Sequence, residues 1–83
     1  MNSKFEIGDW VFFMFPVVAA MDDEIAYRIT NIIKDTYFPK YEVTVYSYDR
    51  IKKVIRIVST LKFNEDMLKE HKAPSWWDEN IVQ

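Results

Sequence analysis

The chain has 83 residues, which is the length of one domain, and a formal net charge of −2. It contains no cysteine, which excludes disulfides and thiolate-bound metals and permits a reducing compartment, and we expect a cytoplasmic location. Aromatic residues make up 17% of the chain, and their large apolar area must supply the core of a domain that folds by packing alone.

The chain opens with a predicted turn that leads into a predicted core strand. Gly8 and Asp9 favour a tight turn, because glycine adopts positive φ without a Cβ clash and aspartate bonds to nearby backbone. The aromatic run over residues 10–15 is typical of a short buried strand. The longer apolar stretch, residues 10–21, is too short to span a membrane, and its acidic flank is unlike that of a secretory signal. We therefore expect neither export nor membrane insertion.

Three further segments show the alternation of a half-buried strand. They are residues 25–34, 41–48 and 53–63, and a turn is predicted over residues 49–52. Together with the first strand, their alternate apolar positions predict a core made of Val11, Phe13, Phe15, Ile29, Val43, Val45, Ile55 and Ile57.

The C-terminal part predicts one short helix and a tail. Asn64 is a good N-cap, acidic residues follow it and a proline ends the pattern, so we expect a helix over residues 64–72. The tail, residues 75–83, contains Trp76 and Trp77, and adjacent tryptophans are rarely left in water. Two interpretations of these tryptophans stay open: they plug an open end of the fold, or they contact a partner.

These elements predict a mainly β fold in a single domain that covers residues 1–83. The expected architecture is a small antiparallel barrel of four to five strands with one short C-terminal helix.

The first strand and its turn carry a resemblance to a known family. The opening FEIGDWV, residues 5–11, resembles the F-x-x-G-D-x-V start of SH3-like barrels of the KOW and Tudor kind. The resemblance covers roughly residues 5–70 and implies a central hairpin and a short helical turn before the last strand. SH3-like barrels bind peptides, proteins or nucleic acids and are seldom enzymes. The glycines of KOW domains after the first strand are absent here, so only the fold is transferred, and an OB-like barrel is the alternative.

Charge is distributed unevenly along the chain. Residues 28–62 carry eight basic and three acidic side chains, whereas the segments on both sides are acidic. Such a chain can be bipolar in space although it is nearly neutral overall. The simpler interpretation is that these charges keep sheet edges from pairing with other sheets.

The phase of the strands places an aromatic face opposite the predicted core. The outward positions include Trp10, Phe12, Tyr46 and Tyr48, although an outer sheet face in water should be polar. The tail tryptophans, a second copy of the chain or a partner must therefore cover part of this face. We predict a partner-binding site formed by these aromatic residues and nearby cations: Trp10, Phe12, Tyr46, Tyr48, Arg28, Arg50, Lys52, Lys53 and Arg56.

Two functions from different classes fit this pattern. The first is a protein-interaction module, an adaptor or inhibitor of the kind that phages and mobile elements encode, which binds a larger protein or forms a homodimer. The second is a nucleic-acid binder that stacks bases on Tyr46 and Tyr48, although the overall acidity opposes it. We expect no enzyme and no cofactor, because His71 is the only histidine and no nucleophile or base accompanies it. The acids at 22–24 lack the spacing of a calcium loop, so no metal site is expected either.

Overall fold

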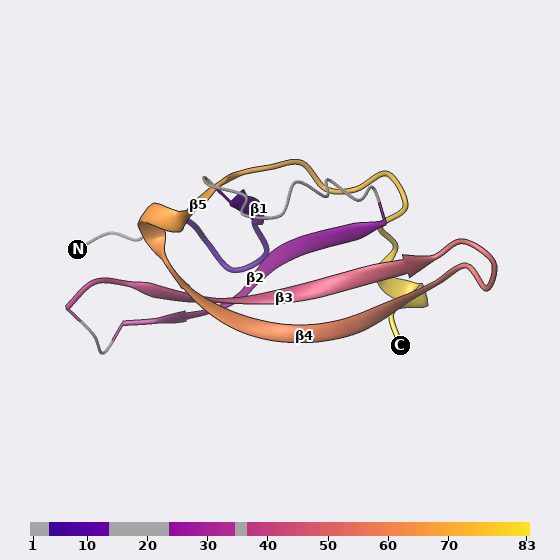
Figure 1. Cartoon of the computed structure of the whole chain (residues 1–83), viewed down its shortest axis with the longest axis horizontal. Helices are drawn as coiled ribbons and strands as arrows, with labels where there is room; N and C mark the ends of the chain where they lie inside the picture. The colour runs from indigo at the N-terminus through magenta and orange to yellow at the C-terminus, as the bar shows by residue number, and fades with distance from the viewer. Residues whose placement is uncertain (1–3, 14–23, 35–36) are drawn as a thin grey trace.

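The strands form one five-stranded antiparallel sheet (Figure 1). The computed structural model describes residues 4–13, 24–34 and 37–83. The strands are β1 (Trp10–Phe13), β2 (Ile25–Ile33), β3 (Lys40–Asp49), β4 (Val54–Asn64) and β5 (Leu68–Glu70). Two 3₁₀ turns, η1 (Glu65–Met67) and η2 (Glu79–Ile81), lie between β4 and β5 and in the tail. The mainly β class and the three alternating strands are therefore confirmed.

The sheet has the order β4-β3-β2-β1-β5, so β4 and β5 are its two edges. The described residues contain no pairing between these edges, and the prediction of a closed barrel is wrong. A sheet closes only when its edge strands meet, and β5 has just three residues and pairs with β1. Figure 1 shows β2, β3 and β4 running along the length of the molecule, whose extents are 43 × 27 × 19 Å.

The helix predicted over residues 64–72 is also wrong. Asn64 is extended and its side chain makes no capping hydrogen bond, and only the single turn η1 follows it. Leu68 then begins β5 opposite Phe13 of β1 and is 1% exposed. Pairing with a strand more than fifty residues away and burial of Leu68 outweigh the local helix signals, which contribute only about 1 kcal/mol each.

One face of the sheet carries the main core. Val11 lies opposite Tyr27, and Ile29 lies opposite Val43, so these side chains share one face. The core consists of the buried side chains Phe5, Val11, Ile29, Tyr41, Val43 and Leu68, with Phe13, Tyr27, Ile32 and Phe63 packed against it. The predicted core positions Val11, Phe13, Ile29, Val43 and Val45 therefore lie at or beside this core, whereas Phe15 lies outside the described residues.

A bulge in β4 changes the phase of this strand. Val45 lies opposite Ser59, but the next residue, Tyr46, lies opposite Ile57, so Val58 is an extra residue without a partner. Because side chains alternate with a period of two, one inserted residue transfers all positions before it to the other face. The placement of Ile57 in the main core was therefore wrong, and this side chain is 53% exposed.

The bulge places Ile55 in a second, smaller core on the opposite face. Ile55 lies opposite Tyr48 and is completely buried. Val82 of the tail bridges to Ile55, and the backbone N–H of Gln83 donates to the Ile55 carbonyl at 2.8 Å. The prediction that Ile55 belongs to the core holds, but the core that contains it is formed with the tail.

Hydroxyl groups satisfy the polar centre of this second face. Thr44 is 6% exposed, and its hydroxyl lies 2.8 Å from that of Thr30 and 3.4 Å from that of Thr60. The three threonines form a ladder across β2, β3 and β4, so the buried hydroxyl keeps hydrogen-bond partners.

The predicted turn at Gly8 and Asp9 is confirmed. Gly8 has φ of +100°, a conformation that only glycine adopts without strain. Its N–H donates to the Ile29 carbonyl at 2.8 Å, which ties the turn to β2. The Asp9 carboxylate accepts from the Glu6 N–H at 2.9 Å, and the Asp9 N–H donates back to the Glu6 carbonyl at 3.1 Å.

Candidate partner-binding surface

The tail tryptophans cover part of the aromatic face. The Trp77 ring meets the ring of Trp10 edge to face at 4.7 Å and the ring of Tyr46 at 4.9 Å. Trp76 stacks on Tyr48, with ring centroids 5.2 Å apart and planes within 6°. Tyr46 is consequently 8% exposed. The chain's own tail is therefore one of the coverings that the sequence allowed.

Arg28, predicted as a binding residue, is engaged inside this arrangement. Its guanidinium carbon lies 5.0 Å from the ring centroid of Trp10 and 5.2 Å from that of Trp77. Its Nε donates to the carbonyl of Gly8 at 2.9 Å. Arg28 thus joins the opening turn, β1, β2 and the tail.

Phe12 lies apart from the other predicted aromatic residues. Its ring contacts His71 at 5.6 Å and Tyr27 at 6.0 Å, and the Lys69 ammonium lies 5.8 Å from its centroid. Phe12 belongs to the pairing of β1 with β5, whereas Tyr48 lies near the turn between β3 and β4.

The remaining predicted cations gather around the β3–β4 turn, which Asp49 organises. Its Oδ1 accepts hydrogen bonds from the N–H groups of Ile51 at 2.9 Å and Lys52 at 3.1 Å. These bonds, from Lys52 first, and the charges of Arg56 and Lys52 hold the pKa of Asp49 below its ordinary value of 3.8. Lys53 completes the turn with φ of +55°. The turn predicted over residues 49–52 is therefore confirmed.

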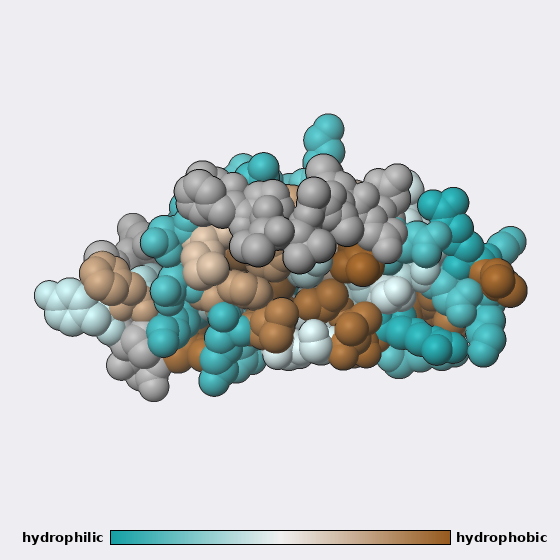
Figure 2. All heavy atoms as spheres, viewed as in Figure 1, coloured by the Kyte–Doolittle hydropathy of each residue, from teal (hydrophilic) through white to brown (hydrophobic). Residues whose placement is uncertain are grey.

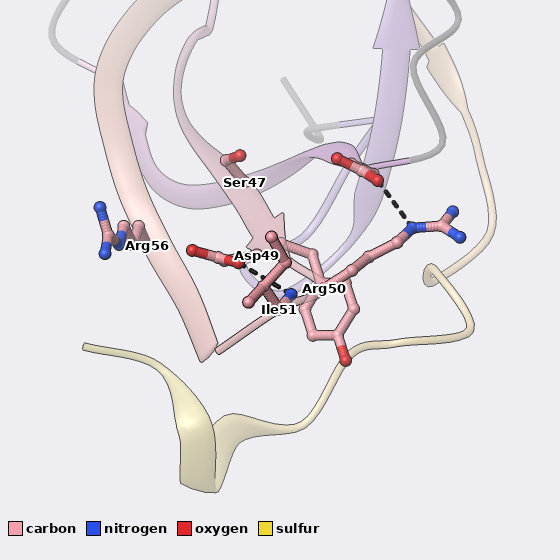
Figure 3. A pocket seen from close by; sticks show the side chains of 7 residues that line it. Ser47, Asp49, Arg50, Ile51 and Arg56 are labelled. Atoms are coloured by element: carbon pink, nitrogen blue, oxygen red, sulfur yellow. Dashed lines mark hydrogen bonds and ion pairs between the residues drawn. The ribbon is translucent and has the colours of Figure 1, made fainter. Parts of the chain in front are cut away.

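A shallow hollow of about 360 Å³ lies beside this turn. In Figure 3, Ser47, Asp49 and Arg56 line one part of it, and Arg50 reaches away from Asp49. The Arg50 Nε pairs with a Glu24 carboxylate oxygen at 2.6 Å. Both side chains are well exposed, so this pair adds little to stability. Arg56 is exposed and lies at the start of β4.

The β4 edge, to which no other named strand of the described residues pairs, is a candidate surface that the sequence did not predict. All seven residues of β4 from 56 to 62 are exposed. Three of them are apolar: Ile57, Val58 and Leu61 are 53%, 60% and 44% exposed. Figure 2 shows apolar side chains along the lower part of the molecule, where β4 runs, between hydrophilic ones. No local signal could have located this surface, because in a regular strand one of the two adjacent apolar residues Ile57 and Val58 would be buried.

The nine predicted site residues therefore fall into three groups. Trp10, Tyr46, Tyr48 and Arg28 lie with the tail, and Phe12 lies beside β5. The third group surrounds the β3–β4 turn and consists of Arg50, Lys52, Lys53 and Arg56.

Within residues 4–13, 24–34 and 37–83, no three His, Asp or Glu side chains are grouped to hold a metal ion. No helix in this part of the chain has the length and apolar character to cross a membrane. No family model matches the chain, and neither a curated protein nor a solved structure matches it.

Proposed function

We propose that this protein is a small, non-catalytic protein-interaction module that binds a larger protein through the open edge of β4 and the adjoining turn. We call this region the β4 surface and define it as residues 56–62 with Arg50, Lys52 and Lys53. The observation that carries the proposal is the run of seven exposed residues on an edge strand, three of them apolar. Exposed apolar residues that cluster on one element are typical of interaction sites.

The strand arrangement supports an SH3-like architecture for the module. The order β4-β3-β2-β1-β5 contains the central β3–β4 hairpin that the opening motif implies. The single turn η1 stands directly before the last strand, where that resemblance expects a short helical turn. In this interpretation the module is an open SH3-like sheet whose second face is covered by its tail.

The aromatic residues have a different place in this proposal. Tyr46 is almost fully buried, and Trp10 and Tyr48 each carry a tail tryptophan on their rings. They stabilise the fold that presents the β4 surface. Direct partner contact through Trp10, Phe12 or Tyr48 stays a prediction.

Nucleic-acid binding is the second candidate, and the four cations around the β3–β4 turn favour it. Base stacking, however, requires accessible aromatic faces, and Trp76 occupies a face of Tyr48. The chain also carries a net negative charge, which weakens phosphate binding. Protein binding is therefore the proposal that we put to the test.

The test places a photo-reactive amino acid at Val58, in the middle of the β4 surface. Val58 is 60% exposed and is the bulge residue, so replacement leaves both cores intact. Irradiation in a lysate of the native cell should give one or a few defined protein adducts. The matched control carries the same group at Lys72, which is exposed and lies beyond β5.

The two positions separate binding from background. Adducts at position 58 that disappear when unlabelled protein is added in excess support the proposal. Identical adducts at positions 58 and 72, or none at 58, would show that the β4 surface is not a protein-binding site.

A further inference from the structure

We draw no further inference here: the strongest candidate, the outer edge of β4 with the exposed side chains Ile57, Val58 and Leu61, belongs to the surface already described, and nothing in the described part of the structure shows which kind of partner covers it.

Discussion

Asp49 determines the conformation of the β3–β4 turn through its charge. The carboxylate accepts two backbone hydrogen bonds, and its pKa lies below the ordinary value of 3.8. A depressed pKa means that the unfolded chain binds this proton more readily than the folded chain. The contribution of Asp49 to stability is therefore complete above pH 3.8 and disappears as the pH falls through the lower folded pKa.

Replacement of Asp49 by Asn should reveal this contribution. The amide oxygen of asparagine still accepts hydrogen bonds but carries no charge. The Asp49→Asn variant should therefore have a lower thermal midpoint than the wild type at pH 7. Below pH 3.8 the midpoints of wild type and Asp49→Asn should converge, because the wild-type carboxyl is then becoming neutral. Melting curves of both proteins from pH 7 to pH 2 measure this difference in thermal midpoint. Groups that titrate in the same way in both proteins do not contribute to the difference. A difference that does not change with pH would contradict the role of the charge.

Lys53 adopts a left-handed conformation that glycine would adopt without strain. Its φ is +55°, the only positive value for a non-glycine residue in the described part of the chain. Lys53→Gly should raise the free energy of unfolding by about 0.5–1 kcal/mol, because relief of strain exceeds the entropy gained by the unfolded chain.

The neighbouring Lys52→Gly variant is the control, since Lys52 has no positive φ. It should lower the free energy of unfolding by up to about 1 kcal/mol while removing the same charge. Urea denaturation of both variants measures the two signs, and a shift of the same sign in both would argue against backbone strain.

At the scale of elements, the tail acts as the cover of the second core. Trp77→Ala should reduce the free energy of unfolding by roughly 2–4 kcal/mol, because it removes ring contacts with Trp10 and Tyr46 and leaves a cavity. Tyr37→Ala removes an aromatic ring that is 88% exposed and should change the value by less than about 0.5 kcal/mol. Urea denaturation followed by circular dichroism compares them, and equal stability of the two variants would show that Trp77 is not structural.

The elements also show what can be predicted from sequence. β2, β3 and β4 were predicted because each alternates over eight or more residues, which a helix would not tolerate. The phase within β4 was not predictable, because the bulge at Val58 arises from how β4 fits against β3 and has no local signature. β5 was missed for a similar reason: its partner is β1, far away in the sequence, while the local residues favour a helix.

The candidate site was predictable only in part. The cations of the β3–β4 turn could be located because the turn lies between two clear strands. The roles of Arg28 and Tyr46 could not, since both depend on where the tail docks. The apolar residues of the tail indicate that the tail is buried. Because these residues show no periodicity, they do not indicate against which surface they pack.

At the scale of the whole molecule, one sheet holds two cores on its opposite faces. All three tryptophans of the chain lie on the second face or in the tail that covers it, so tryptophan fluorescence reports this face. Far-UV circular dichroism reports the whole sheet. Because β3 and β4 contribute to both cores, we expect the two signals to give the same unfolding midpoint. A lower midpoint by fluorescence would mean that the tail and the second core unfold separately.

The order of the strands also bears on the rate at which the protein folds. β2, β3 and β4 follow one another and pair as neighbours, whereas β1 must meet β5 across a loop that runs from Val11 to Glu70. Closing a long loop is entropically costly and occurs late. We therefore expect Asp49→Ala in the central hairpin to slow refolding, and Trp77→Ala in the late-docking tail to accelerate unfolding instead. Stopped-flow measurements of the folding and unfolding rates would distinguish these two effects. If the central hairpin forms first, the β4 surface is formed before β5 and the tail complete the two cores.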